Sequence, residues 1–164
     1  MILHAETALL PEGWATDVRI RIAEGRIVEV TPGAPREGLV LGCLLPAPVN
    51  LHSHTFQRAM AGMTEGRTAG QDSFWTWREV MYGFALRLSP DDLEAVAAQA
   101  YVEMLKAGYS CVGEFHYLHH QPDGQAYDEP AEMALRCISA AERSGIAITM
   151  LPTLYAHGGF GGKP

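Results

Sequence analysis

Cysteine is scarce in this sequence, and its placement suits neither a disulfide framework nor a structural zinc site. The 164 residues contain 3 cysteines, Cys43, Cys111 and Cys137, which are far apart and form no Cys-x-x-Cys pair. An odd number of separated cysteines favours reduced thiols in a cytoplasmic protein. We interpret all three as small buried hydrophobic residues.

Positive charge is also in short supply. The chain has 12 Lys and Arg against 19 Asp and Glu, a formal net charge of -7 and a pI near 5.4. Because nucleic acids and acidic membranes repel such a protein, neither is expected as its main partner. The N-terminus has no cationic start and predicts no signal peptide, and no apolar run reaches membrane-spanning length. The whole sequence is 48% apolar and 19% charged, which is typical of an ordinary globular domain.

Short strands dominate the first 45 residues. Ile2 to Leu10, Val18 to Ile22 and Arg26 to Val30 have strand patterns, and Glu24-Gly25 predicts a tight turn between the last two. These segments predict a small antiparallel sheet. Val40 to Leu45 is more uniformly apolar, which predicts a strand buried on both faces of a parallel sheet and leading into the histidines that follow.

Helices and strands alternate after residue 70. We expect a helix capped by Asp72 or Ser73, a helix with Ser89 as its N-cap, a strand from Tyr109 to Phe115, a helix from Pro130 to near Gly145, and a strand from Ile146 to Leu154. This order predicts βα units with parallel strands. Three parallel strands cannot hide their edge, so we expect the chain to be the N-terminal part of something longer.

The segment His52-Ser53-His54 is the strongest candidate site. Alternate side chains of a strand point to one face, so His52 and His54 present two imidazoles side by side. Two imidazoles make half of a metal shell, and Pro46, Pro48 and Asn50 break regular structure where a buried strand would emerge into a loop. The alternative is a pair of hydrogen-bonded structural histidines at a strand end.

Four segments carry more specific motifs: NLHSHTFQRAMAG (Asn50 to Gly62), DSFWTWREVMY (Asp72 to Tyr82), EMLKAGY (Glu103 to Tyr109) and EFHYLHH (Glu114 to His120). They resemble the amidohydrolase superfamily of metal-dependent hydrolases, and within it the N-formimino-L-glutamate deiminases. The resemblance implies an α/β fold. Residues 1–45 would be the β-sandwich portion, and residues 46–164 would be the first βα units of a (β/α)8 TIM-type barrel. Ala47 departs from the superfamily's usual Gly, which changes backbone freedom only.

The resemblance also implies roles for five residues. His52 and His54 would be the first two ligands of a mononuclear zinc, while Gln57, Arg78 and Tyr117 would bind substrate. An Arg guanidinium can form a forked pair with a carboxylate, and Gln and Tyr supply directional hydrogen bonds. The remaining metal ligands and the acid/base residues would lie beyond Pro164, so no catalytic residue is expected in this chain.

Other candidates have simpler explanations. Without the resemblance, Arg78 is a solvated helix charge and Tyr117 a packed loop aromatic. Aromatic residues at helical spacing are more often core than pocket lining, and crowded loop histidines are more often structural than metal ligands. The aromatic residues are Phe74, Trp75 and Trp77, and the loop histidines are His116, His119 and His120.

The function that the resemblance implies is zinc-dependent hydrolysis of N-formimino-L-glutamate to N-formyl-L-glutamate and ammonia, a step of histidine degradation. The partners would be a small-molecule substrate and, at full length, a second subunit of a homodimer in the cytoplasm. The 164 residues alone are expected to be inactive. Two alternatives stay open: another amidohydrolase, such as a guanine or chlorotriazine deaminase, or a non-catalytic fragment.

Overall fold

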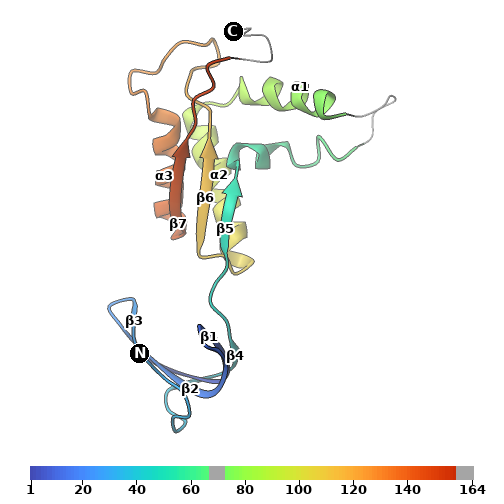
Figure 1. Ribbon diagram of the computed structural model, residues 1–164. Coiled ribbons are helices and arrows are strands. Elements are labelled where there is room, and N and C mark those ends of the chain that lie inside the picture. Colours follow the sequence, from blue (N-terminus) through green and yellow to red (C-terminus); the bar gives the residue numbers. More distant parts are fainter. Residues whose placement is uncertain (67–72, 158–164) are drawn as a thin grey trace. The chain divides into compact units, whose positions relative to one another are not determined.

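The computed structural model describes residues 1–66 and 73–157. The chain forms two compact units, Met1–Ala47 and Pro48–Pro164. Figure 1 labels the helices and strands of both units. Asp72, one of the two proposed helix caps, and the glycine-rich segment after His157 lie outside the described residues.

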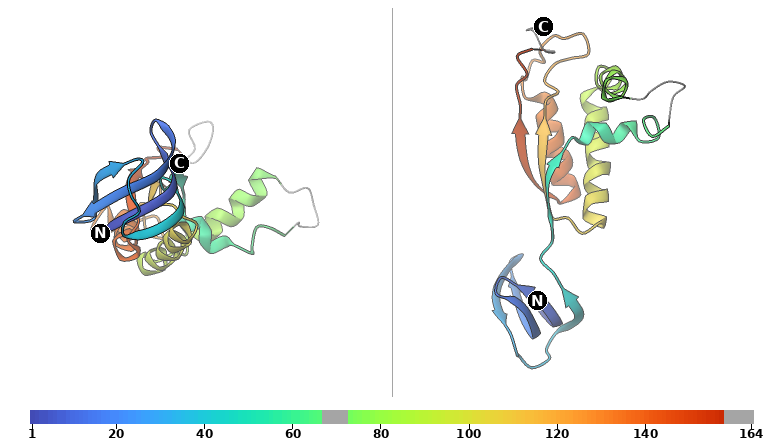
Figure 2. Two further views of the ribbon diagram at one scale, coloured as in Figure 1. Left: turned by 90° about the horizontal axis from the view of Figure 1, so that it is seen from below. Right: turned by 45° about the vertical axis from the view of Figure 1, so that its right-hand side comes forward.

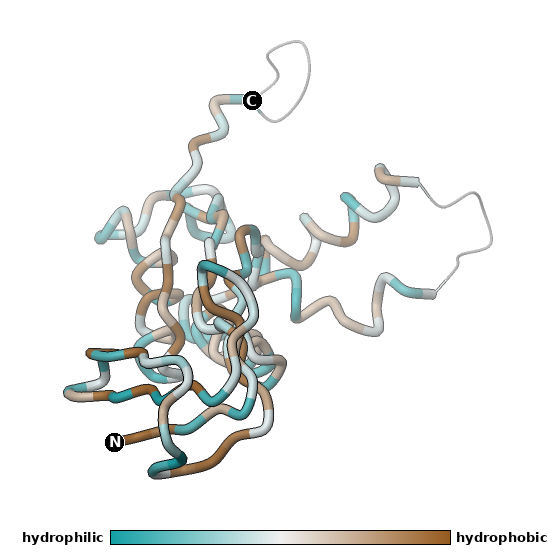
Figure 3. Tube along the Cα trace, turned by 60° about the horizontal axis from the view of Figure 1, so that its bottom comes forward, coloured by the Kyte–Doolittle hydropathy of each residue, from teal (hydrophilic) through white to brown (hydrophobic). Residues whose placement is uncertain are grey.

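The first unit is a four-stranded sheet in the order β3-β2-β1-β4. It consists of β1 (Ile2–Leu10), β2 (Gly13–Ala23), β3 (Arg26–Thr31) and β4 (Leu39–Leu44). The first three strands are antiparallel neighbours, as predicted. Glu24 and Gly25 both have positive φ, 51° and 74°, which is the backbone of the tight two-residue turn that joins β2 to β3. Figure 3 shows both hydrophobic and hydrophilic positions along the N-terminal part of the chain.

The strand predicted from Val40 to Leu45 is present, but the prediction that it is buried on both faces was wrong. The strand there, β4, pairs in parallel with β1 and belongs to the first unit, and its Leu39 and Val40 are 59% and 41% exposed. Cys43 on the same strand is exposed as well, against the expectation that it is buried. A uniform apolar run does not reveal which sheet a strand joins, because pairing with β1 depends on residues more than 30 positions away. Prolines without an amide proton then separate β4 from the next strand.

The second unit has a parallel sheet in the order β5-β6-β7. The strands are β5 (Val49–Ser53), β6 (Cys111–His116) and β7 (Ala147–Pro152), so the histidine segment lies at the carboxyl end of β5. Asn50, which was expected to break regular structure, lies inside β5. Helices α2 (Pro90–Lys106) and α3 (Glu132–Ser144) cover one face of this sheet (Figures 1 and 2). The prediction of βα units with parallel strands is confirmed.

Local capping explains where the helices of the second unit begin and end. Helix α1 (Phe74–Ala85) starts at Ser73 and α2 at Ser89, each with a reciprocal capping box, and Pro90 occupies the first turn of α2. Gly145 ends α3 with φ of 85°, a conformation that glycine adopts without strain. A 3-10 helix, η1 (Thr55–Met60), follows β5 directly.

The core of the second unit lies between the helices and the sheet. It includes Phe56, Leu93, Tyr101, Val112 and Cys137, all at most 3% exposed. Residues Val112, Glu114 and His116 of β6 point into this core, whereas Phe115 points to the opposite face, where it contacts both histidine rings. Within the part of the chain that is described, no helix is both long and apolar enough to cross a membrane.

Candidate functional site

His52 and His54 lie side by side at the carboxyl end of β5. Their Nε2 atoms are 3.0 Å apart and their ring centroids 4.6 Å apart, with the rings nearly perpendicular. A metal ion bonds imidazole nitrogen at about 2.0–2.1 Å, so two nitrogens at this separation can share one ion. The two rings therefore lie side by side, as the alternation of strand residues predicts, and the same separation also allows a hydrogen bond between them.

The orientation of the His54 ring is fixed by the backbone of β6, and its Nε2 is directed at the His52 ring. Nδ1 of His54 lies 2.8 Å from the carbonyl oxygen of Phe115 and donates to it, because a carbonyl can only accept. The proton therefore sits on Nδ1, and the Nε2 lone pair faces His52. Histidine ligands are commonly fixed by a hydrogen bond of this kind from the other ring nitrogen.

A bulge brings the backbone of β5 close to β6 beside the histidines. The register of the two strands shifts between Asn50 and Ser53. At Gly113 of β6, an added Cβ would lie 2.9 Å from the carbonyl oxygen of Leu51, which is too close for any side chain. The side-chain oxygen Oδ1 of Asn50 accepts the backbone N–H of His52 at 3.2 Å, a bond within the same bulge. Glycine at position 113 is thus required by the close approach that places His52.

Gln57 and Tyr117 meet next to the histidine pair. Gln57 Nε2 donates to the Tyr117 hydroxyl at 3.2 Å, and the Tyr117 ring packs edge-on against His54 at 5.2 Å. Burial raises the pKa of Tyr117, and the Gln57 hydrogen bond opposes that shift. Tyr117 therefore stays a neutral hydroxyl, able to donate and accept.

Arg78 lies on α1, where two aromatic rings hold its guanidinium. It lies 5.0 Å from the ring centroid of Tyr82 and 5.7 Å from that of Trp75, and it donates to the Tyr82 hydroxyl at 3.1 Å. Phe74 and Trp75 are mostly exposed, so the expectation that they pack in the core is wrong for these two. Trp77 does pack against the core.

The second group of histidines is engaged in other contacts. His116 is 3% exposed, and burial lowers its pKa to about 4, with the nearby His119 adding to the effect. His119 Nε2 bonds the carbonyl oxygen of Thr153 at 2.9 Å. In residues 1–66 and 73–157, no group of three or more His, Cys, Asp or Glu side chains is placed to hold a metal. The described site therefore offers two ligands, His52 and His54.

Sequence reasoning missed a buried carboxylate beneath the histidine segment. Glu114 is 1% exposed, and its Oε1 accepts the backbone N–H of Thr55 at 2.7 Å and the Thr55 hydroxyl at 2.9 Å. Burial raises the pKa of Glu114, while both Thr55 bonds oppose the shift. The available signal was an acidic residue, the first of EFHYLHH, that follows the apolar residues of the predicted strand, because a carboxylate is buried only with partners.

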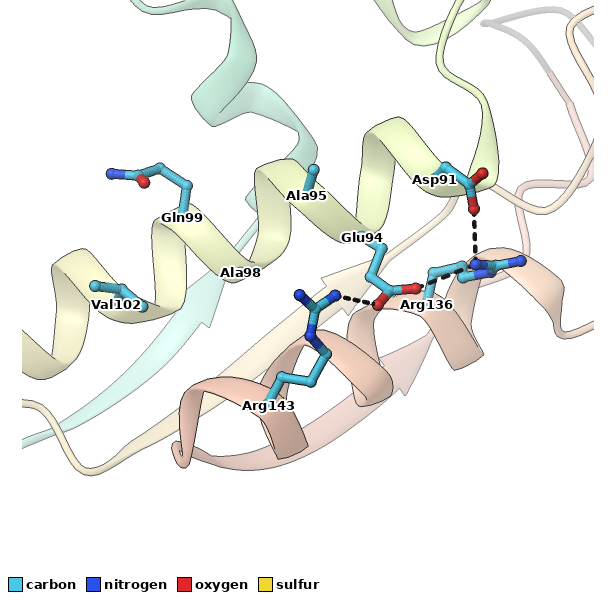
Figure 4. Close-up of a pocket in the computed structure, with 8 residues that line it drawn as sticks. All are labelled: Asp91, Glu94, Ala95, Ala98, Gln99, Val102, Arg136 and Arg143. Atoms are coloured by element: carbon cyan, nitrogen blue, oxygen red, sulfur yellow. Dashed lines mark hydrogen bonds and ion pairs between the residues drawn. The ribbon is translucent and has the colours of Figure 1, made fainter.

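The surface groove between α2 and α3 is an ion-pair network. Its charged side chains neutralise one another, as Figure 4 shows: Glu94 binds Arg143 at 2.8 Å and Arg136 at 3.1 Å, and Asp91 binds Arg136 at 2.9 Å. These contacts join the two helices and engage each charged side chain of the groove in an ion pair.

Comparison with solved structures shows the fold of the amidohydrolases. The chain matches an amidohydrolase from Brucella melitensis with a TM-score of 0.91 and 50% identity, over 99% of this chain and 37% of that one. It also matches an atrazine chlorohydrolase from Arthrobacter aurescens TC1, complexed with zinc, with a TM-score of 0.73 and 18% identity, over 96% of this chain and 36% of that one. In fold, the chain is thus similar to about a third of each of these two longer chains.

The sequence comparisons point to one type of enzyme, formimidoylglutamate deiminase. Residues 1–38 match the family model of the formimidoylglutamate deiminase HutF N-terminal domain. The formimidoylglutamate deiminase of Pseudomonas aeruginosa is 54% identical over 99% of this chain and 36% of that protein. The resemblance to formimidoylglutamate deiminase is thus confirmed. The chain spans about a third of the length of the relatives it matches.

Proposed function

We propose that this chain supplies the first two metal ligands and part of the substrate site of an enzyme that hydrolyses N-formimino-L-glutamate to N-formyl-L-glutamate and ammonia. The observation that carries the proposal is the His52–His54 pair at the end of β5, with Nε2 atoms 3.0 Å apart, in a chain 54% identical to a formimidoylglutamate deiminase. In the reaction, water oxygen adds to the formimino carbon. The bond from that carbon to the imino nitrogen then breaks, and the nitrogen leaves as ammonia.

The histidine pair fits a divalent metal such as zinc. Both donors are imidazole nitrogens, which zinc accepts readily, and the bond from His54 Nδ1 to Phe115 directs the other nitrogen toward His52. A bound zinc ion would supply activation of the attacking water. The zinc complex of the atrazine chlorohydrolase supports this choice of metal for a protein of the same fold.

Gln57, Tyr117 and Arg78 would bind the glutamate part of the substrate. Gln57 and Tyr117 are already joined beside His54, so they can orient a polar group next to the metal. Arg78 would form a forked pair with a carboxylate, and its place between Trp75 and Tyr82 limits how far the guanidinium can swing. Their roles are positioning the substrate and resisting its motion during attack.

The surrounding architecture follows from the same proposal. Residues 1–45 would be part of a β-sandwich, and residues 46–164 would be the first βα units of a (β/α)8 barrel, with β5, β6 and β7 as its first strands. Catalytic sites of such barrels lie at the carboxyl ends of the strands, where His52 and His54 are. We place the enzyme in the cytoplasm, as a homodimer at full length.

A chimeric enzyme tests the function. The chain replaces the aligned N-terminal segment of the Pseudomonas aeruginosa deiminase, and ammonia release from formimidoylglutamate is measured. We expect turnover, loss of turnover in His52→Ala, and a fall in kcat/KM of about 30-fold in Arg78→Ala, because a charged hydrogen bond contributes about 2 kcal/mol. Arg87→Ala, at an exposed arginine after α1, is the matched control. A folded chimera without turnover contradicts the proposal.

The rival activities make a different prediction for Arg78. Guanine and chlorotriazine substrates have no carboxylate, so their turnover would not depend on a guanidinium that binds one. An Arg78→Ala chimera that loses formimidoylglutamate turnover but hydrolyses guanine or a chlorotriazine as well as the parent does would favour those activities.

A further inference from the structure

The carboxylate of Glu114 binds the chain immediately after the metal pair. Strand β5 ends at Ser53, which pairs with Glu114 in the last rung of the β5–β6 ladder. Thr55, two residues on, begins η1, where a backbone N–H has no partner within the helix. Glu114 Oε1 accepts that N–H at 2.7 Å, so a side chain continues the connection where the ladder stops.

The same oxygen holds Thr55 a second time. It accepts the Thr55 hydroxyl at 2.9 Å, and Thr55 and Glu114 are 2% and 1% exposed. Both hydrogen bonds lie at a buried position, where water cannot compete for the donors. Two such bonds to one residue fix both its backbone and its side chain.

The neighbouring residues on both strands form the other half of the connection. His54 Nδ1 donates to the carbonyl oxygen of Phe115, which directly follows Glu114. The end of β5 is therefore attached to β6 at two adjacent points, His54 to Phe115 and Thr55 to Glu114. Release of Thr55 would let the turn after His54 rotate and would break the bond that fixes the His54 ring.

We propose that Glu114 is a positioning residue for the metal pair: by binding Thr55 from within the core, it holds the His54 ring with its Nε2 directed at His52. The inference rests on the proposed metal role of the two histidines. A carboxylate suits the task because a single oxygen accepts both bonds. Glutamine retains an oxygen that can do the same, whereas alanine retains none.

The tautomer of His54 in the metal-free chain is the first measurement. Two-bond nitrogen–proton correlation spectra of the histidine rings distinguish protonation at Nδ1 from protonation at Nε2. We expect the Nδ1-protonated form in the wild type and in Glu114→Gln, and a mixture of both forms in Glu114→Ala. The zinc dissociation constant, measured by competition with a chromophoric chelator, should rise about 10-fold in Glu114→Ala and stay near wild type in Glu114→Gln.

Val112→Ala is the control for a merely structural effect. Val112 is fully buried on the same face of β6, two residues before Glu114, and the substitution removes packing without touching Thr55. It should lower the thermal midpoint while the tautomer and the zinc affinity stay unchanged. Equal changes in Val112→Ala and Glu114→Ala would overturn the inference, as would an unchanged tautomer and affinity in Glu114→Ala.

Thr55→Val covers the case in which Glu114→Ala does not fold. This variant loses the hydroxyl bond and keeps the backbone bond, so a partial shift toward the Nε2-protonated form is expected, and no shift would overturn the inference. A wild-type chain that binds no zinc would contradict the proposed metal centre instead. The metal-free tautomers would still decide whether Glu114 positions His54.

Discussion

Single residues in the core of the second unit have altered acid–base properties. Burial, with a smaller contribution from the charge of Glu114, raises the pKa of the Cys137 thiol to about 12, so this cysteine is a neutral, unreactive core residue. The pKa of His116 on β6 shifts downward instead, to about 4, because burial disfavours the charged form of the imidazole. Both groups are uncharged at neutral pH.

The neutral state of His116 predicts an acid-sensitive fold. Unfolded His116 takes up a proton near pH 6.5 and the folded residue near pH 4, so the unfolded state binds more protons between these values. The contribution of His116 to the free energy of unfolding is fully present above pH 6.5 and should fall by about 3 kcal/mol as the pH drops to 4. Urea unfolding of wild type and His116→Gln across this range measures the difference.

The contribution of other titrating groups cancels in that comparison. His120→Gln, at an exposed histidine of the following loop, should show the same pH dependence as the wild type. Parallel curves for wild type and His116→Gln would contradict the assignment of the neutral state.

At the scale of single residues, the sequence predicts the adjacent placement of His52 and His54 better than it predicts the groups that orient them. The spacing of His52 and His54 is visible in the sequence, because strand alternation is local. The acceptor that orients His54 is a backbone carbonyl 61 residues away, which every residue type possesses. Glu114 escaped notice for a related reason: its partners are the backbone and side chain of a residue from another strand end.

Among the elements, helix ends were the most predictable feature. Ser73, Ser89 and Gly145 act as predicted because capping depends on residues within one turn. The burial of strand β4 was predicted wrongly, because its pairing partner, β1, is distant in sequence. The helix η1 is held to α2 by a forked ion pair, in which Arg58 donates to both Glu103 oxygens at 2.7 Å.

This ion pair should contribute stability that is lost in acid. The hydrogen bonds from Arg58, then Gln99, lower the pKa of Glu103 from 4.5 to about 2. Because the folded pKa is the lower one, the contribution is present above pH 4.5 and disappears as the pH falls through 2. Glu103→Gln should therefore show a smaller fall in thermal midpoint than the wild type between pH 4.5 and 2, and a weaker dependence on salt.

Glu142→Gln, at an exposed position of α3, is the matched control for Glu103→Gln. It should behave as the wild type. If Glu103→Gln also follows the wild-type curve, the pair contributes nothing measurable, as is common for exposed ion pairs.

At the scale of the whole chain, the order of elements predicted a parallel βα unit, and the structure confirms it. Handedness rules and the need to cover the sheet make such an arrangement readable from alternating patterns. A metal site is not readable in this way: within residues 1–66 and 73–157, no three potential ligands come together, and the proposed site has two, His52 and His54. The chain spans about a third of the length of the relatives that it matches.

The central claim is that His52 and His54 bind a metal. Equilibrium dialysis of the chain against zinc, followed by elemental analysis, tests it directly beside the double variant His52→Ala, His54→Ala. The free zinc concentration is set high enough to fill a two-ligand site. We predict zinc bound to the wild type in clear excess over the double variant, with unchanged circular dichroism. Equal zinc in two folded proteins would contradict the claim and would make the histidines structural.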